Sequence, residues 1–165
     1  MRSFKTLPGI SAGVLLALAG AAQAAIVQDT FQVTANVIAS CSVAAADMDF
    51  GDFDGSTDLT ATSDIDVTCT DDHPYQITLD AGSTVGSTIG NRLLTNGTHT
   101  LAYNLYTDGG FSTIWGNTTA DDVEGVGAGL ATAVTHTVHG ELPAAGNENA
   151  STGLYSSTIT VTVTY

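Results

Sequence analysis

Basic residues are nearly absent from this sequence. Lys and Arg together number 3 in 165 residues, against 17 Asp and Glu, and the formal net charge at pH 7 is −14. Arg2 and Lys5 lie near the start, so the rest of the chain has Arg92 alone. Nucleic-acid binding and adhesion to anionic membranes both depend on Lys and Arg side chains. The composition therefore argues against both functions and predicts an acidic, self-repelling exterior.

A hydrophobic run long enough to cross a bilayer is also lacking. The longest apolar stretch, residues 10–22, is too short for a membrane-spanning helix. It follows a basic start and precedes a small-x-small cleavage site, Ala22-Gln23-Ala24. This pattern predicts a signal peptide at residues 1–24 that is removed on export, with no membrane insertion. The remaining residues 25–165 suit one domain with its own core.

Helical periodicity is absent, and only 3 prolines occur in the chain. Short runs of alternating polar and apolar residues, separated by turn residues, predict an all-β fold. We expect a β-sandwich, with a closed barrel as the alternative architecture. Loops are expected at residues 52–62 and 116–129. The strands are expected in the alternating segments 27–37, 65–69, 75–79, 93–94, 101–105, 134–140 and 155–165.

Cysteine is scarce, and its count is even: Cys41 and Cys69 are the two in the chain. In an exported protein two cysteines predict one intramolecular disulfide. By closing a loop over residues 42–68, such a bridge stabilises the fold by roughly 3–4 kcal/mol.

Catalytic motifs in the sequence lack the context that they require. A G-x-S-x-G match at residues 9–13 lies inside the predicted signal peptide. The glycines between Gly125 and Gly129 lack both the full G-x-G-x-x-G spacing and a surrounding βαβ unit. Ser, His and Asp show no triad pattern. We therefore predict that the protein is not an enzyme and needs no cofactor.

Metal-binding patterns are incomplete as well. His136 and His139 are three residues apart, which places them on opposite faces of a strand. The densest acidic stretch, Asp47 to Asp58, has alternating carboxylates of the kind that bind calcium. Phe50, however, occupies the place of the first ligand, and a later bidentate Glu is absent. A solvated acidic loop is the prediction, and calcium binding there is left open.

The two ends of the predicted mature chain carry matching alternating segments. In residues 27–37 the apolar side chains share one face, which Asp29 interrupts; in residues 155–165 a second apolar face runs to the last residue. We expect the final strand to border an unfilled groove, and the first segment to be a strand that can fill such a groove on a neighbour. The alternative is that residues 27–37 form the first strand of their own domain. The donor face consists of Val27, Phe31, Val33, Ala35 and Val37, and the groove strand presents Ile159, Val161, Val163 and Tyr165.

Several short markers in a fixed order support one family resemblance, over residues 25–165. The sequence resembles the spore coat protein U domain family, which includes subunits of archaic chaperone–usher pili. The markers are Phe31-Gln-Val-Thr-Ala before Cys41, Met48-Asp-Phe-Gly51, Ile65-Asp-Val-Thr-Cys69, Leu101-Ala-Tyr-Asn-Leu-Tyr106, Trp115-Gly116, Val138-His-Gly140 with Leu142-Pro143, and Gly153-Leu-Tyr155 leading to Tyr165. The sequence departs from the family at Ser156-Ser157, where an acidic residue is usual.

The resemblance implies an immunoglobulin-like sandwich that lacks its last strand. A periplasmic pilus chaperone would lend a strand during folding, and an outer-membrane usher would then assemble the subunits into a homo- or heteropolymer. In that fibre the N-terminal extension of the next subunit replaces the missing strand, which is donor-strand complementation. The implied organisation is a signal peptide at 1–24, a donor extension at 25–37 and a sandwich domain at 38–165.

The implied function is that of a structural subunit of a surface fibre for attachment and biofilm formation. Export to the periplasm and then to the cell surface follows from it. One alternative is a secreted carbohydrate-binding module, which needs exposed aromatic residues; Trp115, Tyr106 and Phe111 are the candidates. A second alternative is a spore or cell coat protein.

Overall fold

The structure is a computed structural model that describes residues 23–165. Most of the predicted signal peptide, at residues 1–22, lies outside the described residues. The chain divides into two units, residues 1–36 and residues 37–165. Residues 23–40 form no strand, although their alternation predicted one over residues 27–37. Their side chains are exposed: Val27 by 93%, Phe31 by 88% and Val33 by 81%.

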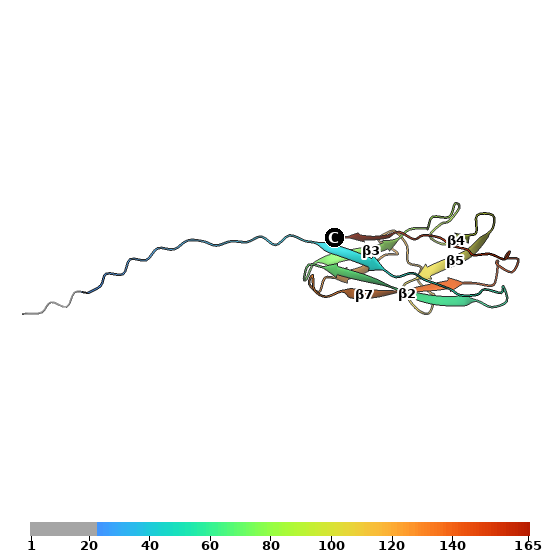
Figure 1. The fold of residues 1–165 in the computed structure, drawn as a ribbon, viewed down its shortest axis with the longest axis horizontal. Helices are drawn as coiled ribbons and strands as arrows, with labels where there is room; N and C mark the ends of the chain where they lie inside the picture. The colour runs from blue at the N-terminus through green and yellow to red at the C-terminus, as the bar shows by residue number, and fades with distance from the viewer. Residues whose placement is uncertain (1–22) are drawn as a thin grey trace, which may run out of the picture. The chain divides into compact units, whose positions relative to one another are not determined.

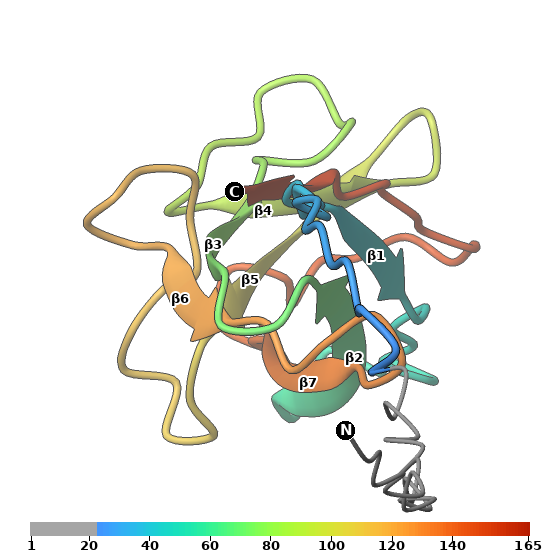
Figure 2. The same ribbon diagram turned by 90° about the vertical axis from the view of Figure 1, so that its left-hand side faces the viewer.

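The second unit consists of eight strands in two antiparallel sheets (Figures 1 and 2). The five-stranded sheet has the order β1-β2-β7-β5-β4, and the three-stranded sheet has the order β6-β3-β8. No helix occurs among residues 23–165, so none there could cross a membrane. The predicted all-β sandwich is confirmed. The strands are β1 Cys41–Ala45, β2 Leu59–Cys69, β3 Pro74–Leu79, β4 Arg92–Thr95, β5 Thr100–Tyr106, β6 Val123–Val126, β7 Val134–Leu142 and β8 Val161–Thr164.

Three strands of the sandwich differ from the sequence prediction. The final one, expected over residues 155–165, is a regular strand only at Val161–Thr164. β2 begins at Leu59, inside the segment expected to be a loop. The polar residues at the start of β2 face solvent on the outside of the sheet, and they gave this part of the strand the composition of a loop. β6 lies inside the glycine-rich segment 116–129. Glycine is needed at position 125 because a Cβ atom there would collide with the ring of Tyr75 on the neighbouring strand β3. The glycine therefore interrupts the alternation of β6, and the sequence pattern predicted a loop where the structure has a strand paired with β3.

The core lies between the two sheets, where the inward faces of the strands meet. Alternate residues of β2, β3 and β5 supply most of it, as the period of a strand requires. Burying each large aliphatic side chain stabilises the fold by about 1.5–3 kcal/mol. The buried apolar residues are Ile65, Val67, Cys69, Tyr75, Ile77, Leu79, Leu101, Tyr103, Leu105, Trp115, Val138 and Leu142.

Candidate functional site

The sandwich is open along one side, between the outer edges of β1 and β8. Each of these strands ends its sheet, and the two lie near each other in space (Figure 2). In the described residues β1 pairs with β2 and β8 pairs with β3. Among these residues, the other edge of each strand makes no ladder of backbone hydrogen bonds with a further strand.

The backbone of the β8 edge follows a strict alternation that extends beyond the strand itself. Thr95 and Ser156 exchange two hydrogen bonds, and the carbonyls of Thr158 and Thr160 accept from Ser83 and Asp80 at 3.0 and 3.1 Å. Even-numbered residues from 156 onward therefore bond toward β3 and its neighbours. In an antiparallel ladder the groups of successive residues point to opposite edges. The N–H and C=O groups of residues 157, 159, 161 and 163 consequently point to the open side.

The β1 edge has the same arrangement. The N–H of Thr70 donates to the carbonyl of Ser40 at 2.9 Å, and the N–H of Ala46 donates to the carbonyl of Asp64 at 3.0 Å. Even-numbered residues thus bond to β2, so the backbone groups of Val43 and its odd-numbered neighbours point to the opening. Two rows of backbone donors and acceptors border one gap.

Side-chain burial shows that the interior is uncovered along this gap. Val43 stands opposite Val67, so both face inward, yet Val43 is 42% exposed while Val67 is 0% exposed. Val161 and Val163 stand opposite Leu79 and Ile77, and they are only half-buried although both partners are fully buried. The inward faces of the two edge strands therefore lack a covering layer.

A groove of about 1000 Å³ continues this gap beyond the two strands; Ala45 is the β1 residue and Val161 the β8 residue that line it. Core side chains form its floor, residues 45–55 form one wall, and residues 150–159 with Val161 form the other wall. An apolar floor between two unpaired backbone edges is the arrangement that accepts an extended peptide by β-augmentation. The floor includes Ile65, Leu79, Leu101, Tyr103, Leu105 and Val138.

The first wall continues from β1 as an extended segment without regular pairing. Met48, Phe50 and Phe53 are half-buried against the core, and the Phe50 ring meets the Tyr103 ring edge-on at 6.1 Å. Gly140 is required beneath them, since a Cβ atom there would collide with the Met48 sulfur. The acidic residues of this wall make local turns: Asp49 accepts from the N–H of Gly51 at 2.8 Å.

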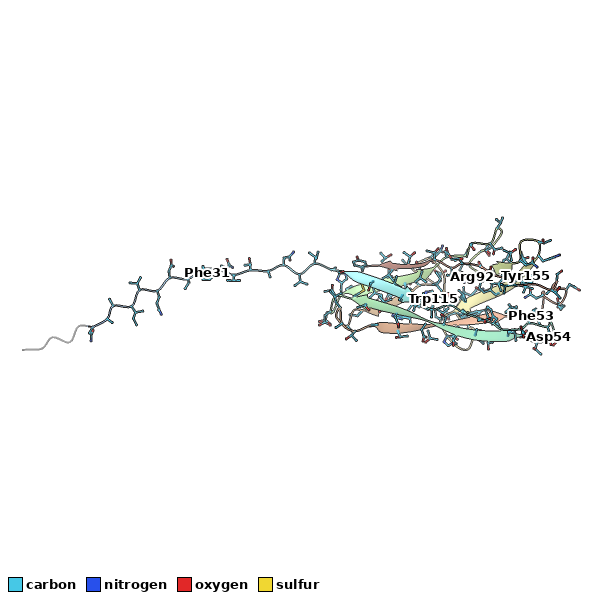
Figure 3. The ribbon with its side chains drawn as sticks, viewed as in Figure 1. Phe31, Phe53, Asp54, Arg92, Trp115 and Tyr155 are labelled. Carbon is cyan, nitrogen blue, oxygen red and sulfur yellow. A yellow bond between two sulfur atoms is a disulfide. The ribbon has the colours of Figure 1, made fainter. Side chains whose placement is uncertain are left out.

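A buried arginine supports the second wall. Arg92 is 0% exposed, and it lies inside the domain beside Trp115 (Figure 3). Its guanidinium donates to the carbonyl of Trp115 at 2.7 Å, to Asn104 Oδ1 at 2.8 Å and to the carbonyl of Asp80 at 2.9 Å. Burial lowers the pKa of Arg92. No pattern around Arg92 predicts that the one Arg after the predicted signal peptide lies in the core.

Asp80 joins this arginine to the groove wall. Its carboxylate accepts from the backbone N–H groups of Gly82 and Thr160, both at 2.9 Å. Burial alone raises the pKa of Asp80, but hydrogen bonds from Thr160 and Gly82 and the charge of Arg92 outweigh it and hold the pKa below its usual value. Asp80 thereby fixes the segment that leads into β8.

The predicted groove residues are placed as follows. Ile159 and Val161 line the groove, Val163 packs partly against the core, and Tyr165 is 57% exposed with its ring edge-on to His73 at 6.1 Å. Val163 and Tyr165 are not among the residues that line the groove. The predicted donor residues are all exposed, which leaves their apolar face available; they are Val27, Phe31, Val33, Ala35 and Val37.

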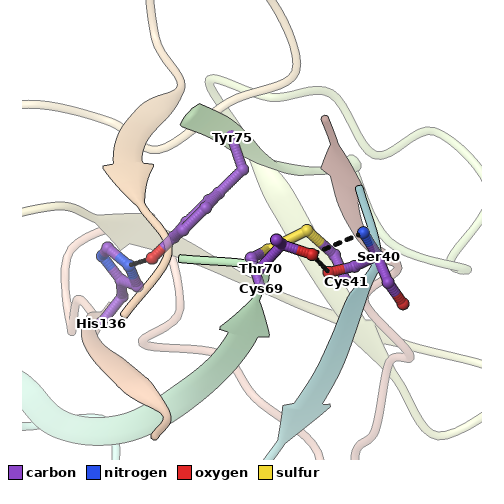
Figure 4. Close-up of a disulfide and its surroundings, with 6 residues drawn as sticks. All are labelled: Ser40, Cys41, Cys69, Thr70, Tyr75 and His136. Atoms are coloured by element: carbon purple, nitrogen blue, oxygen red, sulfur yellow. Dashed lines mark hydrogen bonds between the residues drawn. A yellow bond between two sulfur atoms is a disulfide. The ribbon is translucent and has the colours of Figure 1, made fainter. Parts of the chain in front are cut away.

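The disulfide links the first strand to the core. Cys41 and Cys69 are bonded and stand directly opposite in the β1–β2 ladder (Figure 4). Beside it, Ser40 N–H donates to Thr70 Oγ1 at 2.9 Å. The predicted pairing is present, and it clamps β1 at its first residue.

Histidines and acidic residues are dispersed in the described part of the chain. No group of three or more His, Cys, Asp or Glu side chains within residues 23–165 is arranged to hold a metal ion. His136 faces inward, where its ring is 2.8 Å from the Tyr75 hydroxyl, and His139 lies on the outer face of β7. The absence of a metal requirement stays a prediction.

One of the three aromatic candidates for a carbohydrate site was wrong. Trp115 is 1% exposed, and its indole N–H donates to the carbonyl of Ile77 at 2.9 Å. A single Trp in a glycine-rich segment gives no periodicity from which burial can be read. Tyr106 and Phe111, by contrast, are partly exposed and lie together, with ring centroids 5.5 Å apart.

The chain belongs to the Spore Coat Protein U domain family, whose model matches residues 27–162. It is 30% identical to Protein U of Myxococcus xanthus, in an alignment that covers 100% of both chains.

A solved structure has a similar fold. It is the crystal structure of the CsuC–CsuE chaperone–tip adhesion subunit pre-assembly complex from archaic chaperone–usher Csu pili of Acinetobacter baumannii. The TM-score is 0.59 at 20% identity, and the match covers 78% of this chain and 40% of that chain. At this level of sequence identity, the similarity to the solved structure shows a shared fold and nothing more.

Proposed function

We propose that this protein is a structural subunit of a surface fibre that assembles by donor-strand complementation. The observation that carries the proposal is the groove between residues 45–55 and residues 150–159, the segments that continue the unpaired edges of β1 and β8. The filling strand is the segment 27–37 of a second copy or of another subunit. The family membership and the fold shared with a chaperone–usher pilus complex support this reading.

The alternation of the two segments makes them complementary. On the β8 side, odd-numbered residues direct both their side chains to the interior and their backbone groups to the gap. In the N-terminal segment apolar side chains likewise alternate with polar ones. A strand that turns this apolar face to the interior buries it and can pair with the free edge at the same time. Each large side chain so buried stabilises the assembly by roughly 1.5–3 kcal/mol, before the cost of ordering the segment.

The proposal defines the parts of the chain and their partners. Residues 1–24 direct export, residues 25–37 donate the strand, and residues 38–165 form the receiving domain. A periplasmic chaperone fills the groove until the usher exchanges its strand for that of the next subunit. The fibre then serves attachment and biofilm formation at the cell surface.

Deletion of residues 25–37 tests the proposal. The shortened protein should still fold with its chaperone, because the groove and the disulfide lie in residues 41–165. It should form no fibres in electron micrographs, yet it should bind a synthetic peptide of residues 25–40 in a one-to-one complex. Fibres of normal length from the deletion variant would contradict the proposal. The peptide with Phe31 and Val33 replaced by Asp is the matched control, and it should not bind.

A further inference from the structure

A second group of chemically distinctive side chains lies on the outer face of the five-stranded sheet, where β5 and β7 pair. Tyr106 stands opposite His139, and Glu141 lies two residues further along β7 on the same face. Thr62 and Thr60 on β2 stand opposite His139 and Glu141. The floor of the groove, in contrast, is made of inward-facing residues of these strands.

The loop after β5 holds Phe111 over this surface. Asp108 accepts hydrogen bonds from the N–H groups of Gly110 and Thr113, both at 2.9 Å, and from the Ser112 hydroxyl at 3.0 Å. These bonds lower the pKa of Asp108, with that from Thr113 the largest cause. Phe111 has a φ of 54°, which is unusual for a residue with a large side chain. Backbone strain of this kind persists where the surroundings impose it, and it is concentrated at functional sites.

The rings and polar groups form a corner that is open to solvent. The planes of Tyr106 and Phe111 are inclined by 75°, so one ring edge meets the other face. The Tyr106 hydroxyl donates to Glu141 Oε2 at 3.3 Å. Gly109 lies next to the imidazole of His139, since a Cβ atom there would be in van der Waals contact with its Cε1 at 3.4 Å. All four side chains are partly buried, with part of each still reaching solvent: Tyr106, Phe111, His139 and Glu141.

We propose that this corner, made by Tyr106, Phe111, His139 and Glu141, is a binding site for a neutral or amino sugar. The apolar C–H face of a pyranose packs on an exposed aromatic ring, and its hydroxyl groups bond to the carboxylate, the imidazole and the neighbouring threonines. A few polar groups around an aromatic surface are typical of small-ligand sites.

The charge of the protein surface around this corner determines which classes of saccharide could bind there. In residues 23–165 the single Lys or Arg is Arg92, which is fully buried. The surface of that part of the chain thus offers no basic side chain of this kind to a uronate or sulfate group, and Glu141 would repel one. Anionic polysaccharides are therefore excluded as ligands, whereas an amino group on the sugar would be attracted.

Saturation-transfer NMR observed on the saccharide tests the site, because the signal is obtained whether the protein is monomeric or assembled. The mature chain, residues 25–165, is titrated separately with chitotetraose, cellotetraose and tetragalacturonate. We expect transfer to at least one of the two neutral tetrasaccharides and none to the uronate. Phe111→Asn should weaken that binding about tenfold or more, since one stacking surface is lost. Asn tolerates a positive φ, so the loop conformation is kept.

The control variant is Leu130→Ala, which removes an exposed apolar side chain outside both this corner and the groove and should leave binding unchanged. Glu141→Gln tests the carboxylate and should weaken binding of a chitosan tetramer more than that of its acetylated form. Absence of transfer to all neutral and amino tetrasaccharides would overturn the proposal. Binding that survives Phe111→Asn would also overturn it. Melting curves of each variant separate loss of the site from loss of the fold.

Discussion

Residues 27–37 and residues 155–165 have the same alternating pattern, but the structure treats them differently. The later segment lies along β3 and the residues that follow β3, with its odd side chains from Tyr155 to Val163 half-buried and its even backbone groups bonded at about 3 Å. The earlier segment forms no strand, and Phe31 is 88% exposed. Alternation therefore encodes the ability to form a strand, while an available edge decides whether the strand forms. The β8 segment has an edge on its own chain, and we propose that the N-terminal segment finds one on another chain.

The largest expected effect comes from making the N-terminal segment unfit for the groove. Phe31→Asp would place an unpaired charge in an apolar pocket, which costs several kcal/mol. We expect fibre formation to be abolished, as counted by electron microscopy of assembled protein. Gln32→Asp is the matched control, because residue 32 is on the opposite, polar face, and it should assemble normally. Equal loss from both substitutions would mean that the face of this segment does not matter.

Removal of the arginine that supports the other segment should have the next largest effect. Arg92→Met leaves the carbonyls of Asp80 and Trp115 and the amide oxygen of Asn104 without their donor. We expect a loss of roughly 3–5 kcal/mol in the free energy of unfolding, measured by urea denaturation. Arg92→Lys should recover part of this loss, because an ammonium group replaces some donors. Unchanged stability of Arg92→Met would show that the network does not hold the groove wall.

Loss of the disulfide should have a comparable or smaller effect. Replacing Cys41 and Cys69 together with Ala releases β1 from β2 at its first residue. We expect a loss of about 3–4 kcal/mol relative to the oxidised protein. The reduced wild-type protein should match the double variant, and a large difference between these two would contradict the expectation.

The smallest predicted effect is pH-dependent and concerns β3, the strand on which the β8 segment lies. Burial lowers the pKa of His136, whose ring is hydrogen-bonded to the hydroxyl group of Tyr75 on β3. The folded protein therefore binds fewer protons than the unfolded chain between the lowered pKa and about 6.5. Stability should be fully present above about pH 6.5 and should fall as the pH drops below it. His136→Gln should flatten this part of the melting-temperature profile, and an unchanged slope would exclude His136 as its cause.

Much of the fold could be predicted because most strands carry their own signal. Alternation in residues 65–69 and 101–105 identified β2 and β5, and the even cysteine count identified the disulfide. Alternation is a local pattern and the cysteine count is a property of the composition, so both can be read from one sequence.

Other features arise only from contacts between distant residues. β6 contains Gly125, which alternation cannot reveal, because it is the approach of Tyr75 that requires a glycine there. Arg92 and Trp115 are typical surface or binding residues by type, and they are buried because they bond to carbonyls on other segments. The groove could be expected from two unpaired edges, but its first wall, with Met48 and Phe53, could not.

The position of the disulfide has a mechanical consequence. A pull on the N-terminal segment enters the domain through residues 38–40 and reaches Cys41, the first residue of β1. The load then passes through a covalent bond to Cys69, which is fully buried in the core strand β2. β1 cannot be peeled away from its loaded end, and its ladder with β2 is pulled as one unit. In a filament under tension, the contact that yields first would therefore be the one between the inserted strand and the groove of the neighbouring subunit. The junction between the N-terminal segment and β1 would hold longer.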